Sequence, residues 1–111
     1  MKPFDYDFIL KQIDYWQLIK KLWEEADVNP EIDSLEVATF KLYLRLGSAK
    51  KVSDKLNELG YRVEGKNNNL IKLISNNVTD IIEKSVIPDK DLEKIVKEIQ
   101  KDHKRYINKF F

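Results

Sequence analysis

The sequence contains no cysteine and only one histidine. The lack of the first and the scarcity of the second exclude several classes of functional site. Disulfide bonds, thiolate metal sites and cysteine nucleophiles all require cysteine. A histidine metal cluster requires more than His103, which lies beside the apolar positions of a predicted helix, where structural histidines predominate. No glycine-rich phosphate loop is present. We therefore expect no enzymatic activity, no catalytic or metal-ligating residues and no cofactor, and only a nuclease with scattered carboxylate ligands stays open.

Long apolar runs are also missing. No segment approaches the roughly 20 apolar residues that cross a bilayer. The N-terminus carries Asp5 and Asp7 and does not match a secretory signal. A length of 111 residues with 42% apolar side chains is typical of one folded domain. We expect a single soluble domain in the cytoplasm.

The net charge of +1 lacks the excess of one sign that whole-surface binding to nucleic acid requires. The charge is nevertheless uneven along the chain. Residues 1–39 hold 4 basic and 9 acidic side chains, residues 40–75 hold 8 and 3, and residues 76–111 hold 8 and 7. A basic excess therefore falls on the middle of the chain, where it favours local DNA contact, although such an imbalance also arises in proteins that bind no DNA.

Apolar periodicity predicts a first helix from Phe4 or Asp5 to about Ala26. Its apolar face is broad, and Trp16 and Trp23 lie seven residues apart on the same side. Two interpretations stay open for this stripe. It is either part of the core or, because aromatic residues are enriched at interfaces, a dimer surface.

Pro30 separates the first helix from a second one over 34–46, for which Asp33 and Glu36 predict a capping box. Apolar residues on two sides make this the predicted central helix. A last helix starts near Asp89 and reaches almost to the C-terminus. Its apolar seam comprises Leu92, Ile95, Val96, Ile99, Tyr106, Ile107 and Phe110. The first helix or a second copy of the protein is expected to cover this seam.

The segment from Gly47 to Lys84 carries the pattern on which the functional hypothesis depends. Ser48 predicts the start of a helix that Gly60 ends, and a second short helix begins at Ser75 or Asn76. Between them, alternation and turn residues predict a small hairpin. Two one-sided amphipathic helices on a shared support are typical of a helix-turn-helix DNA reader. The hairpin is then either a wing that contacts DNA or a plain surface turn.

The runs from Ser48 to Arg62 and from Ser75 to Ile82 together resemble the DNA-binding helix-turn-helix segment of serine recombinases and resolvases. Those segments pair a first helix ending Leu-Asn-x-x-Gly, as in Leu56 to Gly60, with a second helix opened by serine and carrying valine and isoleucine on one side. This chain differs in having Ile74 where the family often has tryptophan, and in its longer connecting segment. The resemblance implies a DNA-binding role and none of the recombination chemistry.

DNA contact requires basic side chains for phosphates and polar side chains for base edges. The predicted phosphate ligands are Lys50, Lys51, Lys55, Arg62, Lys66 and Lys72, with Ser48 and Ser75 as caps or phosphate donors. Asn67 and Asn68 lie at the predicted hairpin tip. Asn76, Asn77 and Thr79 are the predicted base readers. Asp80 and Glu83 lie on the same predicted helix and repel phosphates if they face the DNA.

The sequence thus predicts a mainly α fold, a five-helix domain with a helix-turn-helix core and a wing-like β-hairpin between helices three and four. Residues 1–111 form one domain, divided into an N-terminal helix and linker (1–33), the core (34–84) and a C-terminal amphipathic helix (85–111). The predicted function is double-stranded DNA binding, as a transcription regulator or a phage or plasmid accessory factor, with a homodimer through the terminal helices. The alternative is a protein-interaction module, such as an inhibitor, an adaptor or a phage anti-defence protein.

Overall fold

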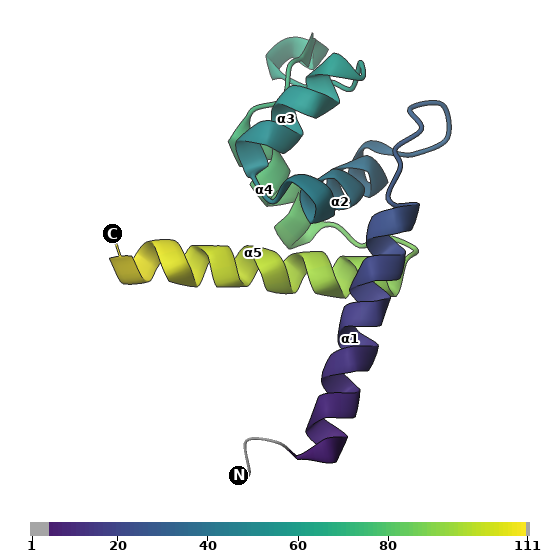
Figure 1. Cartoon of the computed structure of the whole chain (residues 1–111). Coiled ribbons are helices and arrows are strands. Elements are labelled where there is room, and N and C mark those ends of the chain that lie inside the picture. The colour runs from purple at the N-terminus through teal and green to yellow at the C-terminus, as the bar shows by residue number, and fades with distance from the viewer. Residues whose placement is uncertain (1–4, 111) are drawn as a thin grey trace.

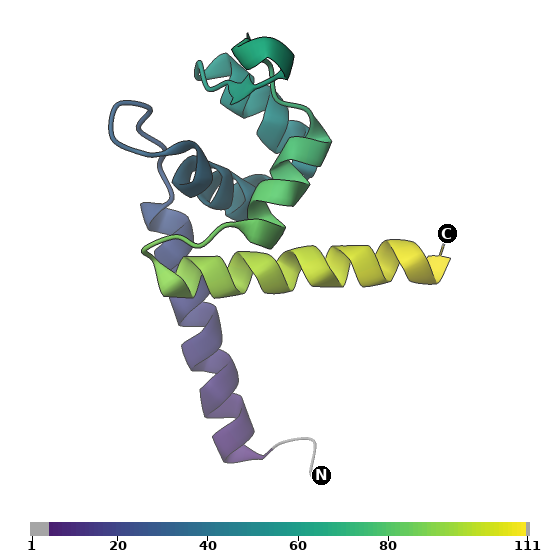
Figure 2. The ribbon, with the colours of Figure 1, turned by 180° about the vertical axis from the view of Figure 1, so that it is seen from behind.

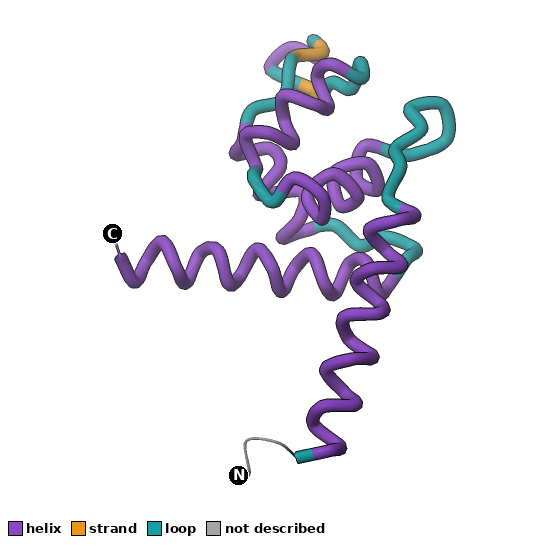
Figure 3. The backbone as a smooth tube through the Cα atoms, in the orientation of Figure 1, coloured by secondary structure: helices purple, strands orange, loops and turns teal. Residues whose placement is uncertain are grey.

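The computed structural model describes residues 5–110, and the side chains of residues 5–102. Within this range the fold is mainly helical, with five α-helices and a two-stranded antiparallel hairpin between the third and fourth helices, as predicted. Figure 1 shows the arrangement and Figure 3 its secondary structure. The elements are α1 (Tyr6–Glu25), α2 (Leu35–Leu46), α3 (Ala49–Glu58), β1 (Val63–Glu64), η1 (Lys66–Asn68), β2 (Leu70–Ile71), α4 (Ser75–Lys84) and α5 (Lys90–Phe110). None of the described helices is long and apolar enough to span a membrane.

Helix α2 is the central buried helix, as predicted, but its cap differs from the predicted one. The Ser34 hydroxyl oxygen accepts from the N–H of Val37 at 3.2 Å. The Asp33 carboxylate instead accepts from the N–H of Asn29 at 2.9 Å and pairs with Lys41 at 3.1 Å. Asp33 therefore closes the preceding turn, one position too early to cap the helix.

The core forms where α2, α3, α4 and the first half of α5 meet. Phe40 from α2, Leu56 from α3 and Ile82 from α4 are fully buried, and Val96 from α5 packs with them. These side chains come from four helices. Helices α3 and α4 are therefore fixed to the same support. This is the arrangement that their one-sided apolar faces require.

Helices α3 and α4 are joined through the hairpin. Gly60, at φ 96°, supplies the left-handed residue that ends α3. Val63 pairs with Ile71 and Glu64 with Leu70. Figures 1 and 2 show the hairpin at the end of the molecule opposite to the N-terminus of α1.

Helix α1 corrects one interpretation of the sequence. Only Leu22 is buried along it, and Ala26 is buried just after it. The interpretation as core is therefore wrong for the exposed part of the stripe, Phe8, Ile9, Ile13, Trp16 and Trp23. The N-terminal half projects away from the body (Figure 2). Consequently the radius of gyration is 16.2 Å, against about 13 Å for a compact chain of this length.

Helix α5 crosses beneath α2 and α4. It begins after Asp89, whose carboxylate accepts from the N–H of Leu92 at 3.1 Å. Leu92, Ile95 and Val96 are buried, so the predicted seam is confirmed over the first half of the helix. Its main cover is α2 and α4, and not α1 or a second copy as predicted. The predicted roles of His103, Tyr106, Ile107 and Phe110 concern side chains outside the described part of the chain.

Candidate nucleic-acid interface

The hairpin is held in place by Asn57, in the last turn of α3. Its amide Nδ2 donates to the carbonyl of Leu73 at 2.9 Å, and its Oδ1 accepts from the N–H of Leu73 at 2.8 Å. Leu73 is buried and lies two positions before the first residue of α4. The two hydrogen bonds therefore fix where the chain leaves the hairpin and enters α4, and the sequence prediction missed this role of Asn57.

The hairpin tip exposes the predicted polar residues together. Lys66, Asn67, Asn68 and Lys72 are all exposed. Asn67 and Asn68 both have positive φ, at 64° and 61°, a conformation that asparagine adopts more readily than most residues. The chain has no acidic side chain from residue 65 to residue 79. We call residues 65–76 the hairpin end; it carries the basic Lys66 and Lys72 and is bordered by the exposed Glu64, which pairs with Leu70.

Helix α4 presents only part of its predicted reading face. The Oδ1 of Asn77 accepts from the N–H of Ile74 at 2.8 Å, so this side chain caps its own helix. Thr79 is half-buried, and its carbonyl accepts from the Gln100 amide of α5 at 3.4 Å. The Thr79 hydroxyl donates to the Ser75 carbonyl at 3.2 Å, so the side chains of Asn77 and Thr79 are both hydrogen-bonded within α4. Asn76 remains exposed and is the one predicted reader in an accessible position.

Ser75 begins α4, as predicted, but it does not cap this helix. Ile74 is the N-cap residue, and Ser75 is the first residue of α4 rather than its cap. Its side chain is exposed. The hydroxyl is therefore available to a phosphate, while capping falls to Asn77.

Two of the predicted phosphate ligands are engaged inside the fold. The Arg62 guanidinium donates to the carbonyls of Asn57 and Tyr61, at 3.0 and 2.6 Å, and is half-buried. It thus satisfies backbone groups at the C-terminus of α3 instead of facing solvent. The Ser48 hydroxyl oxygen accepts from the N–H of Lys51 at 3.4 Å and caps α3. Both roles are structural.

The remaining lysines lie along α3, away from the hairpin tip. Lys50 pairs with Asp54 at 3.2 Å and Lys55 with Glu58 at 3.4 Å, while Lys51 is exposed. Such surface pairs contribute little and exchange readily with other partners. Because α3 has 10 residues, its two ends lie about 15 Å apart. The structure therefore does not bring Lys50 and Lys51 into the hairpin end.

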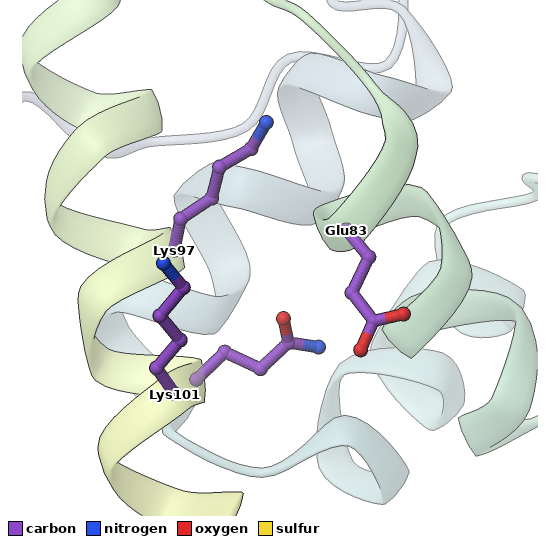
Figure 4. A pocket seen from close by; sticks show the side chains of 4 residues that line it. Glu83, Lys97 and Lys101 are labelled. Carbon is purple, nitrogen blue, oxygen red and sulfur yellow. The ribbon is translucent and has the colours of Figure 1, made fainter.

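Carboxylates limit how α4 can meet a phosphate backbone. Asp80 and Glu83 are exposed on the helix after its first turn. Glu83, Lys97, Gln100 and Lys101 line an open groove of about 450 Å³ between α4 and α5. Figure 4 shows Glu83 directed toward this gap from α4, while Lys97 extends away from its carboxylate. The groove therefore has mixed charge, and the basic surface of α4 is confined to its N-terminal turn.

Among the described residues, the resolved pKa shifts belong to tyrosines. Partial burial and the nearby Asp33 raise the pKa of Tyr61, whose hydroxyl donates to the Asp33 carbonyl at 2.8 Å. Burial also raises the pKa of Tyr43. Both shifts belong to structural tyrosines. Among the described residues, no three histidine, aspartate or glutamate side chains gather as a metal site would require.

Comparison of the sequence and structure with protein-family models, curated proteins and solved structures finds no match. The resemblance of residues 48–83 to recombinase helix-turn-helix segments therefore stays a prediction from the sequence.

Proposed function

We propose that the protein acts by binding double-stranded DNA through the hairpin end. The observation that supports this most is the exposure of Lys66, Lys72 and Asn76 on a stretch of sequence, residues 65–79, without carboxylates. The Asn57 hydrogen bonds and the core fix this stretch to a rigid helical support. A small chain that binds in this way suits a transcription regulator or an accessory factor of a phage or plasmid.

Each part of the hairpin end has a role in this proposal. Lys66 and Lys72 neutralise phosphates, and the N–H groups in the first turn of α4 add the positive end of the helix dipole. Asn76 reaches base edges, because an asparagine amide matches the donor and acceptor pattern of adenine. Asn67 and Asn68 contact the sugar-phosphate backbone or the minor groove beside the tip.

The acidic residues of α4 decide its orientation in the complex. Asp80 and Glu83 would lie against phosphates if α4 entered the major groove along its whole length. An approach with only the first turn of α4 in the groove keeps both carboxylates in solvent. Helix-turn-helix proteins commonly place the first residues of the recognition helix against the bases.

The proposal is tested by fluorescence anisotropy with labelled duplex DNA at ~50 mM salt, where phosphate contacts are strongest. Wild-type protein is expected to bind, and Lys66→Glu with Lys72→Glu is expected to weaken binding at least about tenfold. Lys11→Glu with Lys21→Glu is the matched control, since it changes net charge equally on exposed positions of α1. Absence of wild-type binding, or equal loss in both double variants, would refute the proposal.

A second candidate function is binding of a protein partner by the same end of the molecule. Leu70 and Ile74 expose 70% and 59% of their surface beside the tip, and Ile71 is also exposed. Exposed apolar side chains that lie together are typical of protein interfaces. If the protein binds a protein partner, Leu70→Ser with Ile74→Ser is expected to abolish binding of that partner. Lys66→Glu with Lys72→Glu is expected to leave this binding unchanged.

A further inference from the structure

Helix α1 carries a heptad seam in addition to the face that meets the core. Apolar side chains recur at alternating steps of three and four residues, which are the a and d positions of a coiled coil. The seam comprises Tyr6, Ile9, Ile13, Trp16, Lys20 and Trp23. Five of its six positions are apolar.

All five apolar side chains of the seam are exposed, by 37% to 71%. The body of the molecule uses a different face of α1. Leu18 and Ile19 are half-buried and Leu22 is buried, and Tyr15 and Leu18 line a small cleft against α5. At 100° per residue, the middle of the seam lies roughly opposite the face that meets α5. Within the described chain, the Arg45 guanidinium, 5.8 Å from the centre of the Trp23 ring, lies over one end of the seam, and the other apolar side chains of the seam stay open to solvent.

The exposed apolar area approaches what a stable interface needs. The five apolar seam residues expose on the order of 600 Å² per chain, and flanking Leu10 and the stems of polar side chains add to this. A standard interface buries about 800 Å² per partner. Apolar patches of this size on a small protein mark an interaction surface.

The seam is complementary to itself when two copies run antiparallel. In that arrangement a positions of one helix face d positions of the other, so Tyr6 meets Trp23, Ile9 meets Lys20 and Ile13 meets Trp16, each pair occurring twice. All six positions are then matched across a two-fold axis. No heterologous partner is needed to explain the pattern.

Lys20 favours antiparallel over parallel pairing of the two α1 helices. A parallel pair places Lys20 of one chain against Lys20 of the other inside the seam, where like charges repel. The antiparallel pair places Lys20 opposite Ile9, so its stem packs and its amine reaches solvent. In the single chain Lys20 already points outward to Glu24, at 3.7 Å on an exposed surface.

From these observations we infer that the protein is a homodimer in which the α1 seams of two copies pair as an antiparallel coiled coil. The inference does not depend on DNA binding. If both hold, the dimer carries two hairpin ends related by a two-fold axis, as a repeated DNA half-site requires.

The mass in solution tests the dimer, by size-exclusion chromatography with light scattering. Wild-type protein is expected at twice the chain mass of 13.2 kDa. Ile13→Glu with Trp16→Glu is expected to give monomers even at about 100 µM, because it places four carboxylates in the seam. The matched control, Ile32→Glu with Val86→Glu, changes two exposed apolar residues outside α1 and should stay dimeric.

A monomeric wild type, a dimeric seam variant, or loss of the dimer in both variants would overturn the inference. Far-UV circular dichroism shows whether the seam variant is folded. If it is not, Ile13→Ala with Trp16→Ala takes its place, and the same shift to monomer is expected. A dimer that persists in that variant also overturns the inference.

Cross-linking tests the direction, since the chain has no native cysteine. Ile9→Cys protein mixed with Lys20→Cys protein is expected to form a disulfide-linked pair on mild oxidation, and neither protein is expected to do so alone. Efficient linkage of Ile9→Cys protein to itself indicates parallel helices and contradicts the antiparallel arrangement.

Discussion

Asn57 and Leu73 are joined by two hydrogen bonds across sixteen positions of the sequence, with the Asn57 side chain as donor in one and acceptor in the other. This pair connects the end of α3 to the entry of α4. The hairpin buries little surface of its own, so the Asn57–Leu73 hydrogen bonds are needed to keep it in a defined position. The accessible lysines and asparagines of the hairpin end depend on it.

Asn57→Ala should lower the free energy of unfolding by about 1–3 kcal/mol, because it leaves the buried N–H and carbonyl of Leu73 without partners. Chemical denaturation measures this loss. Asn76→Ala, an exposed change of the same type, should stay within about 0.5 kcal/mol of wild type. Equal stability of the two variants would contradict the role of Asn57.

Substitution of Asn77 should affect folding stability, whereas substitution of Asn76 should affect DNA recognition. Asn77→Ala removes the side-chain cap of α4 and should cost about 1 kcal/mol, whereas Asn77→Asp keeps the acceptor oxygen and should restore most of it. Thermal unfolding measures both effects. Asn76→Ala should leave the unfolding temperature unchanged and alter the DNA sequence preference. If only Asn77→Asp alters that preference, Asn77 reads bases and the assignment to Asn76 is wrong.

Tyr61 should make stability sensitive to alkaline pH. Its pKa is raised in the folded state by partial burial and then by Asp33, above about 10 in the unfolded chain. The folded state therefore holds the phenolic proton more tightly, so this stabilisation is complete below pH ~10 and is lost as the pH rises through the folded-state pKa. Urea unfolding from pH 8 to 11 should show a smaller decline for Tyr61→Phe than for wild type. A decline as large in Tyr61→Phe as in the exposed control Tyr6→Phe would contradict this.

Arg45 should hold the C-terminus of α1 against α2. Its Nε and Nη2 donate to the carbonyl of Trp23 at 3.0 and 2.6 Å, and its Nη1 pairs with Asp27 at 2.7 Å. Arg45→Lys keeps the charge but loses the planar fork, and should cost about 0.5–1.5 kcal/mol. Thermal unfolding compares it with Lys11→Arg, for which no loss is expected.

Apolar periodicity and breaker residues were sufficient to predict the five helices and the hairpin. Pro30, Gly47 and Gly60 separate the helices, and the spacing of Leu92, Ile95 and Val96 identifies the buried face of α5. These signals are local, so a single sequence carries them. The prediction that α2 is central also depends only on its two apolar sides.

The candidate site was predicted less completely, because polar side chains have several possible partners. Residue type and position mark Arg62 and Asn77 as DNA ligands, yet both side chains bind nearby backbone groups of the chain. No periodicity signals a side chain such as Asn57 that bonds to backbone sixteen residues away. The exposure of Trp16 was likewise unpredictable from the sequence, because core and interface helices share the same apolar pattern.

Mapping of backbone amide shifts in the full chain on titration with duplex DNA at ~50 mM salt tests the central claim most directly. The hairpin-end proposal predicts that the largest changes fall on residues 65–76, with the exposed face of α1 from Asp7 to Trp16 unaffected. Changes that centre on α1 or on the groove between α4 and α5, or no change at saturating DNA, would contradict it.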